Sequence, residues 1–432
     1  MTLSELGELK KVHFIGIGGI GVSAIARKML LEGTKVAGSD QSESPITEEL
    51  KKLGAEVYIG HRAGNLADDA DLVVYTIAIP DTNSELVKAK ELGIRTHTYP
   101  EMLGAISAEH FTVAISGTHG KTTTTAMLGK VARDAKLDPT VIVGSIMKDA
   151  QSNLIVGQGK YLIAEACEYR RSFLNLFPKV LVITNIDAAH LDYYKDLADV
   201  QKAFSELVAK MGKEGVLVCN PNDPHVAPVA EKAECLVVDY TKVDPHFTLK
   251  VPGEHNIKNA QAATAAAGVI GVSEGAIRSS LAEFSGTWRR LEDKGLTKEG
   301  AHLYDDYAHE PEEVAASLSA IRGLYPDKKI TVVFRPHLYS RTKTLLREFG
   351  MSFKDADEIL VTDIYAAREP LDPSIHARDV VAEIGKHKSG ATYVENFVYA
   401  ETYLRDRLKP EEVVITMGAG DIYELAEKLA QK

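Results

Sequence analysis

The sequence predicts a three-domain α/β protein built on mainly parallel sheets. A strand, a glycine-rich turn and a helix follow one another twice, at residues 11–30 and 111–132, and strands alternate with helices from 301 to 416. Alternation of this kind favours parallel sheets covered by helices. Because 432 residues exceed what one hydrophobic core supports, we expect two or three domains. We place them at residues 1–108, 109–287 and 288–432.

Composition narrows the class of protein. The chain is 45% hydrophobic and 26% charged, which is ordinary for a globular protein, and its net charge of −11 argues against a general nucleic-acid binder. Its first residues lack a signal-peptide pattern and no apolar run reaches membrane-spanning length, so we expect no membrane association. The three cysteines lack metal-ligand spacing and fit a reducing cytoplasm. We expect a cytoplasmic monomer or homodimer.

The first domain opens with a dinucleotide-type pattern, which predicts a Rossmann-like fold. A strand at 11–17 runs into glycines that let a diphosphate approach the start of the next helix. The second strand, 35–38, leads to Asp40, which is placed to meet a ribose or a base. The pattern does not separate NAD from another diphosphate ligand. Further strands are expected at 56–59 and 71–76, and helices near 46–53 and 83–92.

The central domain carries a phosphate-binding P-loop. An apolar strand at 111–115 breaks at Gly117, and a helical pattern resumes after Thr122. In this layout the backbone N–H groups of the turn and of the first helical turn bind an anion. Lys121 adds a point charge for the β- and γ-phosphates, and Thr122 offers a hydroxyl to Mg²⁺. The loop is shorter than the common form, whose first glycine would fall at Ile115.

Polar residues end the other strands of the central domain, which are expected at 138–143, 160–164 and 180–184. Because ligands bind beyond the carboxyl ends of parallel strands, we expect Glu165 and His190 to converge on the P-loop, together with Asp187. A carboxylate and an imidazole beside phosphates are reasonable ligands for a divalent metal. The alternative is that His190 caps a turn and Glu165 pairs with a surface lysine.

An alanine-rich helix begins near His255, Asn256 and Asn259. An asparagine amide offers both a donor and an acceptor to the edge of a base, but asparagine also favours helix caps. The residues alone leave these two interpretations open.

The last part of the chain predicts a second Rossmann-like domain with a substrate rim. Residues 284–292, which hold the only tryptophan and two adjacent arginines, indicate an exposed connector that also touches ligand. Polar residues then gather at the predicted ends of several strands, which is typical of a binding edge. They include Asp305, Tyr307, His309, His337 and Arg341.

These features together favour phosphoryl transfer to a substrate oxygen, because no nucleophile is well supported. A phosphorylated carboxylate is an activated acyl group that an amine can displace. Three modules suggest three ligands, which favours an ATP-dependent ligase over a kinase.

The motifs resemble those of the Mur ligase family of bacterial peptidoglycan synthesis over nearly the whole chain. The resemblance rests on residues 16–23, 117–124, 165–174, 184–187, 253–260, 289–292, 305–309, 336–342 and 418–422. It implies ATP-dependent joining of L-alanine to UDP-N-acetylmuramate through an acyl phosphate, with Mg²⁺, or Mn²⁺ in its place.

The resemblance also implies roles for individual residues. The UDP-sugar would be bound by Gly16, Gly18, Gly19, Gly21, Asp40, His61, Thr76 and Ala78. ATP would be bound by Gly117, Thr118, His119, Gly120, Lys121, Thr122, Thr123, His255, Asn256, Asn259, Arg289, Arg290 and Asp305. The amino acid would be bound by Tyr307, His309, His337 and Arg341, and the metal by Thr122, Glu165 and His190. The catalytic set would be Lys121, Glu165, His190, His337 and Arg341.

Several positions depart from the family pattern. Ala189 stands where an aspartate is usual, which bears on metal or substrate placement. Three departures lie near the implied amino-acid pocket and are Glu310, Arg335 and Leu338. Gly144-Ser145 replaces a usual pair of glycines.

Alternative functions remain at this point. A ligase that recycles a tripeptide onto the same UDP-sugar shares the nucleotide residues, and a weakened or non-catalytic relative would fit Ala189. An NAD-dependent oxidoreductase fits only the first glycine turn. The later-acting ligases of the family use a modified lysine, and Phe204 stands at the position aligned with it, which argues against them.

Overall fold

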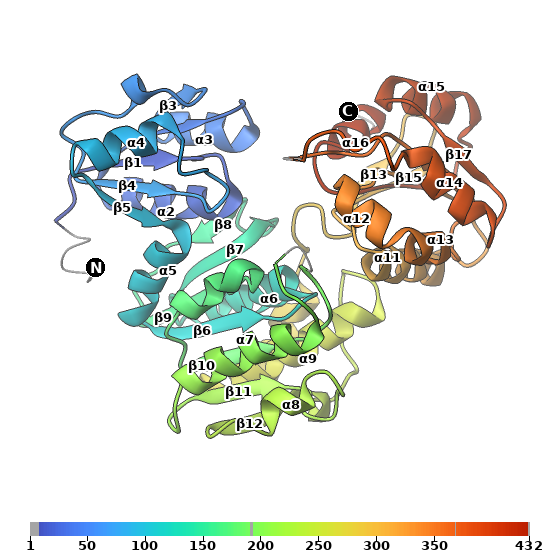
Figure 1. Cartoon of the computed structure of the whole chain (residues 1–432). Coiled ribbons are helices and arrows are strands. Elements are labelled where there is room, and N and C mark those ends of the chain that lie inside the picture. The colour runs from blue at the N-terminus through green and yellow to red at the C-terminus, as the bar shows by residue number, and fades with distance from the viewer. Residues whose placement is uncertain (1–7, 191–192, 368, 431–432) are drawn as a thin grey trace. The chain divides into compact units, whose positions relative to one another are not determined.

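The computed structural model describes residues 8–190, 193–367 and 369–430 (Figure 1). The chain divides into two compact units, one of Met1–Thr248 with Lys258–Phe284 and one of Leu249–Ile257 with Ser285–Lys432. The first unit holds two sheets and the second holds one, so the predicted three-domain α/β fold is confirmed, while the predicted domain boundaries stay a prediction. Over the described ranges, every helix is too short or too polar to cross a membrane.

The N-terminal sheet is fully parallel, with the order β3-β2-β1-β4-β5. Its strands are β1 (Lys11–Ile15), β2 (Lys35–Asp40), β3 (Glu56–Ile59), β4 (Leu72–Tyr75) and β5 (Arg95–Thr98). Its helices are α2 (Ile20–Leu31), α3 (Pro45–Lys52), the 3₁₀ turn η1 (Ala63–Asn65), α4 (Ser84–Glu91) and α5 (Tyr99–Ala108). The sequence did not predict β5 or α5. The edge strand β5, Arg-Thr-His-Thr, has no apolar residue that would mark it as a strand.

The central sheet has seven strands in the order β12-β11-β10-β6-β9-β7-β8, and the β7–β8 pair is antiparallel. Its strands are β6 (Phe111–Ser116), β7 (Thr140–Met147), β8 (Ser152–Ile155), β9 (Tyr161–Glu165), β10 (Val180–Ile183), β11 (Val216–Cys219) and β12 (Leu236–Asp239). Its helices are α6 (Lys121–Asp134), η2 (Tyr169–Asn175), α7 (Leu197–Lys210), α8 (Ala227–Ala230), η3 (Tyr240–Lys242), α9 (Glu254–Val269) and α10 (Glu274–Ala282). Strand β7 continues past Gly144, where the sequence predicted its end.

The sheet of the second unit has the order β13-β14-β18-β15-β16-β17, with β13 antiparallel to β14. Its strands are β13 (Glu292–Leu296), β14 (His302–Asp306), β15 (Ile330–Phe334), β16 (Glu358–Val361), β17 (Ala391–Tyr393) and β18 (Val413–Met417). Its helices are α11 (Pro311–Leu324), α12 (Tyr339–Thr344), α13 (Leu346–Ser352), α14 (Ala377–Gly385), α15 (Phe397–Arg407) and α16 (Tyr423–Leu429). Helices α12 and α13 meet at Leu345.

Strands in the middle of a sheet are buried on both faces, which explains their continuous apolar runs. All residues of β10 and of β15 are buried, as expected for parallel strands that helices cover on both sides. The strands therefore form a rigid base, and their carboxyl ends present the polar residues that follow them.

The prediction of an exposed connector at 284–292 is wrong. Phe284, Thr287 and Leu291 are buried, and the Arg289 side chain is only 3% exposed. The polar residues of this stretch suggested solvent exposure, but the guanidinium of Arg289 has a buried carboxylate as its partner.

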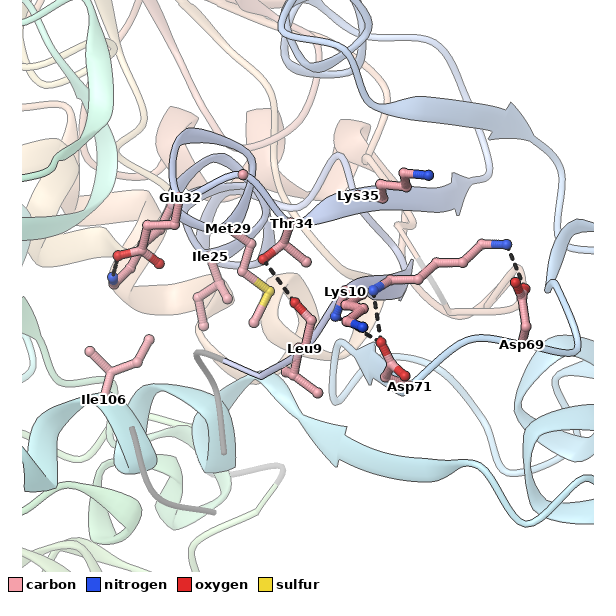
Figure 2. Close-up of a pocket in the computed structure, with 13 residues that line it drawn as sticks. Leu9, Lys10, Ile25, Met29, Glu32, Thr34, Lys35, Asp69, Asp71 and Ile106 are labelled. Atoms are coloured by element: carbon pink, nitrogen blue, oxygen red, sulfur yellow. Dashed lines mark hydrogen bonds and ion pairs between the residues drawn. The ribbon is translucent and has the colours of Figure 1, made fainter. Parts of the chain in front are cut away.

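A cavity of about 700 Å³ lies at the amino ends of β1 and β2 (Figure 2). Its apolar floor is formed by residues that include Leu9, Ile25 and Met29, and an ion pair between Lys11 Nζ and Asp69 Oδ1, 2.5 Å long, lies at its edge. The glycine turn follows the opposite, carboxyl end of β1. None of the predicted site residues lines this cavity.

Candidate active site

The P-loop joins β6 to α6 through two glycines with positive φ. Gly117 has φ 128° and Gly120 has φ 81°, backbone conformations that residues with a Cβ rarely adopt. A Cβ on Gly120 would lie 2.3 Å from Asn259 Oδ1, and one on Gly117 would lie 2.1 Å from Thr184 Oγ1. Both positions therefore require glycine for conformation and for space.

The end of the neighbouring strand β10 holds the P-loop in place. The backbone oxygen of Asn185 accepts from Thr118 N at 3.1 Å, and its side-chain Oδ1 accepts from His119 N at 2.9 Å. Thr184 Oγ1 donates to the oxygen of His119 at 2.6 Å. The loop conformation is thus set by contacts across more than sixty positions of sequence as well as by its glycines.

A buried carboxylate, Glu168, joins two of the predicted catalytic residues. Lys121 Nζ lies 3.0 Å from Glu168 Oε1, and His190 Nε2 lies 3.5 Å from the same oxygen. Lys121 Nζ also donates to the oxygens of Gly117 and Thr118, at 2.5 and 3.0 Å. The ammonium is therefore held at the loop that would bind phosphates.

The charges of Lys121 and Glu168 stabilise each other. Burial alone would lower the pKa of Lys121, but the negative charges around it, Glu168 first, raise that pKa above its ordinary value. Burial would likewise raise the pKa of Glu168, but the charge of Lys121 and the hydrogen bond with His190 lower it. An ionised Lys121–Glu168 pair follows.

The sequence did not predict the contacts of Glu168, although this residue lies three positions after Glu165. Its Oε2 is buried and lacks a hydrogen-bond partner among the described residues. An unsatisfied carboxylate oxygen beside a P-loop is a fitting acceptor for metal-bound water. Two features of the sequence pointed to Glu168, namely a P-loop lysine that needs a counter-charge and the position of Glu168 within the family motif at 165–174.

Two of the three predicted metal ligands lie together. Thr122 Oγ1 donates to Glu165 Oε1 at 3.2 Å, and Glu165 Oε2 accepts from Gly144 N at 2.7 Å. Hydroxyl and carboxylate oxygens suit Mg²⁺, so these residues fit the ion. His190 pairs with Glu168 instead of with Glu165.

Asp187 was expected on the same rim, and its backbone reaches the P-loop. Its N–H donates to Thr118 Oγ1 at 2.8 Å. Its carboxylate lies 3.0 Å from His225 Nδ1, and this hydrogen bond raises the pKa of His225. The carboxylate is thus engaged with an imidazole.

The glycine turn after β1 is closed by Asp40. Gly18 N donates to Asp40 Oδ2 at 2.8 Å, and Gln41 N donates to Oδ1 at 2.8 Å, so this carboxylate organises its own turn. Gly16 has φ 81°, and a Cβ there would lie 2.6 Å from Thr76 Cγ2. Gly19 N donates to the oxygen of Gly16 at 3.1 Å.

Tyr99, at the start of α5, packs against the same turn and escaped the sequence prediction. A Cβ on Gly21 would lie 2.6 Å from the ring of Tyr99. Burial and, to a lesser extent, the charge of Glu165 raise the pKa of this phenol. Ala78 follows Thr76 at the end of β4, with its N–H 3.4 Å from Thr76 Oγ1.

Three of the residues predicted to bind ATP lie at the start of α9. Asn256 Nδ2 donates to the oxygen of Pro252, just before the helix, at 2.6 Å. Asn259 approaches Gly120 of the P-loop. His255 packs against Gly253. A role of these residues in ATP binding stays a prediction.

In the second unit, Arg289 and Asp305 form a buried ion pair. Arg289 Nε lies 2.9 Å from Asp305 Oδ2, and the other guanidinium nitrogens donate to the oxygens of Gly418 and Gly420, at 2.5 and 2.6 Å. Burial raises the pKa of Asp305 in spite of the opposing charge of Arg289. The guanidinium of Arg290 lies 5.4 Å from the ring centre of Tyr307.

The four residues predicted to bind the amino acid gather at one edge of this sheet. The rings of His309 and His337 lie 5.6 Å apart, and His309 Nδ1 lies 2.9 Å from the oxygen of Tyr307. Arg341 contacts His337 Nδ1 at 2.9 Å, and Arg341 cannot accept. His337 Nδ1 is therefore the acceptor, which leaves the ring neutral with its proton on Nε2.

The family departures Glu310, Leu338 and Arg335 have structural partners here. Glu310 Oε1 lies 2.8 Å from Arg341 Nε. Leu338 has φ 67°, and its N–H donates to the oxygen of Tyr365 at 2.9 Å. Arg335 pairs with Asp421.

A further departure, Ala189, lies in a turn of the first unit, in which its N–H donates to the oxygen of Asp187 at 2.8 Å.

Phe204, which the resemblance aligned with the modified lysine of later-acting ligases, is fully buried. It packs edge-on against Phe173 with ring centres 5.1 Å apart. A core position of this kind has no room for a charged ligand of a metal.

Three domain families match the chain in succession. They are described as the Mur ligase family, catalytic domain, over residues 11–111; the Mur ligase middle domain, over 115–247; and the Mur ligase, glutamate ligase domain, over 289–420. Together they cover most of the sequence and all three sheets.

Relatives that are about 40% identical to this chain carry one name. The UDP-N-acetylmuramate–L-alanine ligase of Clostridium acetobutylicum is 40% identical, with 98% of each chain covered, and that of Clostridium novyi is 41% identical, with 97% and 96% covered. The structure of the UDP-N-acetylmuramate–alanine ligase of Thermotoga maritima matches with a TM-score of 0.83 and 28% identity, covering 97% of this chain and 98% of that one. A murein peptide ligase from Psychrobacter arcticus shares the fold at a TM-score of 0.74 and 20% identity, covering 97% and 98%. The chain belongs to the Mur ligase family.

Proposed function

We propose that the chain joins L-alanine to UDP-N-acetylmuramate at the expense of ATP, in the synthesis of peptidoglycan precursors. The buried Lys121–Glu168 pair beside the P-loop carries the proposal, because it holds a cation where phosphates would lie. The shared name of relatives that are 40% identical over nearly the full chain supports the substrates.

The reaction would proceed in two steps. A carboxylate oxygen of the muramate attacks the γ-phosphorus of ATP, ADP leaves, and an acyl phosphate forms. The amine of L-alanine then attacks the acyl carbon to give a tetrahedral intermediate, and loss of inorganic phosphate and a proton completes the amide. Lys121 would stabilise charge on the transferring phosphoryl group, with its position set by Glu168.

A divalent ion, Mg²⁺ or Mn²⁺, would be held by Thr122 and Glu165 with His190 near them. It would neutralise charge on phosphate oxygens. Gly144 N orients the Glu165 carboxylate for this task by donating to its second oxygen.

The second unit would receive the amino acid. The neutral His337 offers its Nε2–H as a donor, and the always-charged Arg341 suits a carboxylate. Glu310 fixes the orientation of Arg341 through Nε. The glycine turn and His61 would bind the UDP-sugar, and a cytoplasmic monomer or homodimer belongs to the same proposal.

Phosphate release tests the proposal. The purified chain is mixed with ATP, Mg²⁺ and UDP-N-acetylmuramate, and single amino acids or a tripeptide are added in turn. We expect release with L-alanine, and none from the Lys121→Ala variant. Release with the tripeptide alone would favour the recycling reaction, and no release with any acceptor would refute a ligase.

Ala189 is tested in the same assay. If the absent carboxylate matters, Ala189→Asp should raise kcat; an unchanged kcat would show that this chain does not need it.

A further inference from the structure

Glu85, in the first turn of α4, is a fully buried carboxylate to which neither the motifs nor the proposed reaction gives a role. Its Oε2 lies 2.7 Å from both His13 Nε2 and Ser39 Oγ. Its Oε1 accepts from Arg62 N at 2.9 Å and from Asn65 Nδ2 at 2.8 Å. Four partners therefore surround one carboxylate inside the N-terminal domain.

These partners keep Glu85 ionised. Burial alone would raise its pKa, but hydrogen bonds from His13 and Ser39, together with the charge of His13, lower that pKa below its ordinary value. An ionised carboxylate can only accept hydrogen bonds. Each of the four neighbours must therefore donate to it.

The single hydroxyl proton of Ser39 determines the state of His61. Because the proton lies on the hydrogen bond from Ser39 Oγ to Glu85 Oε2, Ser39 Oγ can only accept on its other side. His61 Nδ1 lies 2.8 Å from that oxygen and must be the donor. The neutral ring of His61 then carries its proton on Nδ1 and presents a bare lone pair at Nε2.

Ser39 also belongs to the candidate sugar-nucleotide site. Its backbone oxygen accepts from Gly16 N at 2.8 Å and from Ile17 N at 3.0 Å, so one residue joins the glycine turn to His61. The side chain of His61 is 13% exposed, whereas Glu85 lies wholly inside. The network thus connects a buried charge to a ring that a ligand can reach.

We propose that Glu85 is a positioning residue for the sugar nucleotide, which acts through Ser39 to fix His61 in the Nδ1–H tautomer. His61 Nε2 then accepts a hydrogen bond from a donor on the nucleotide, either the imide N–H of uracil or a ribose hydroxyl. This inference rests on the proposed function, in which His61 helps to bind the UDP-sugar.

NMR of the histidine ring nitrogens in the full-length protein without ligand tests the tautomer. We expect His61, assigned by the signal that is missing in His61→Gln, to be protonated on Nδ1 in the wild type. Glu85→Gln places an amide N–H within reach of Ser39, which can then donate to His61, so the Nε2–H tautomer should become populated. Ser39→Ala keeps the carboxylate of Glu85 but should also disturb the Nδ1–H tautomer of His61. Asn65→Ala, which removes a contact to the other carboxylate oxygen of Glu85, should leave that tautomer unchanged.

Binding and kinetics test the consequence for the nucleotide. In Glu85→Gln and Ser39→Ala, KM for UDP-N-acetylmuramate should rise about tenfold, the loss expected for one hydrogen bond, with kcat and KM for ATP unchanged. Analogues that are methylated at uracil N3 or lack a ribose hydroxyl identify the donor on the nucleotide. Only the analogue without that donor should have the same KM in the wild type and in the variants.

Two results would overturn the inference. One is a wild-type His61 protonated on Nε2 alone, and the other is an unchanged KM for the sugar nucleotide in both folded variants. A wild-type protein with the Nδ1–H tautomer but no turnover would instead refute the proposed function, because the tautomer is measured without substrate.

Discussion

Lys121 Nζ lies 3.0 Å from Glu168 Oε1, and both side chains are largely removed from solvent. The pair places a compensated cation at the P-loop, so the loop holds its lysine before any phosphate arrives. Preorganised charge of this kind lowers the cost of reorganisation during reaction.

Glu168→Gln should lower kcat roughly 100-fold, the scale seen when one preorganised charge contact is lost. The neutral amide would no longer fix the ammonium of Lys121 or attract His190. Steady-state kinetics with ATP varied checks this. Glu206→Gln is the matched control, because Glu206 forms a 2.5 Å ion pair with Arg171 in the same unit but lies near the surface. Equal kcat values in the two variants would contradict the role of Glu168.

Gly120→Ala should raise KM for ATP and lower the free energy of unfolding by more than about 2 kcal/mol. The new Cβ combines a φ of 81° with a 2.3 Å approach to Asn259 Oδ1. Gly212→Ala is the control for conformation alone, since Gly212 has φ 60° and open space around it. It should cost about 1 kcal/mol without any change in KM. Denaturant unfolding and initial rates measure both effects.

Local patterns in the sequence predicted those parts of the fold and the site that neighbouring residues determine. The spacing of Gly117, Gly120 and Lys121 encodes the loop itself, and continuous apolar runs encode the buried parallel strands. The same logic missed β5, which forms at a sheet edge from polar residues. Tertiary pairing, and not propensity, makes that strand.

Long-range partners were beyond the reach of local patterns. Glu168 and Lys121 are 47 positions apart, and Arg289 meets the oxygen of Gly418 across 129 positions. Arginines in a polar stretch suggested an exposed connector, because a single sequence does not show the carboxylate that lets Arg289 be buried. The Glu85 network was hidden for the same reason, since Ser39 and Glu85 are 46 positions apart.

Arg289→Ala should lower the free energy of unfolding by about 3 to 5 kcal/mol, because it leaves the buried Asp305 without its cation. Lys343→Ala is the control, since Lys343 lies on the surface of the same unit, 3.9 Å from Asp372, and should cost less than about 1 kcal/mol. Denaturant unfolding of the full chain measures the difference. Similar losses in the two variants would show that the buried pair adds no special stability.

His309 should make the protein less stable in mild acid. Burial lowers the pKa of His309 from 6.5 to about 4, so the unfolded chain binds a proton between these values while the folded chain does not. The contribution of His309 to the free energy of unfolding is therefore constant above pH 6.5 and falls as the pH drops to about 4, by up to about 3 kcal/mol.

The pH dependence of His309→Gln checks this sign. The wild type should lose stability relative to this variant as the pH falls from 6.5 to 4, whereas His387→Gln, at a more exposed histidine, should follow the wild type. A constant difference between wild type and His309→Gln over this range would contradict the buried, neutral imidazole.

Asp306 should act in the opposite direction. Burial raises the pKa of its carboxyl from 3.8 to about 6, so between these pH values the folded chain keeps a proton that the unfolded chain has lost. The contribution of Asp306 to the free energy of unfolding therefore falls as the pH rises through this range. Asp306→Asn should remove that loss and become more stable relative to the wild type between pH 4 and 7, by roughly 3 kcal/mol at most. Denaturant midpoints at several pH values measure it, and a relative stability that does not change with pH would refute the assignment.

The fate of one oxygen atom tests the central claim, that the muramate carboxylate is phosphorylated before the amine attacks. UDP-N-acetylmuramate with a heavy oxygen isotope in its carboxylate is incubated with ATP, Mg²⁺, L-alanine and the enzyme, and the released phosphate is analysed by mass spectrometry. We predict one labelled oxygen in each phosphate released together with the amide product. Amide product accompanied by unlabelled phosphate would contradict the acyl phosphate, and labelled substrate without any product would contradict the ligase itself.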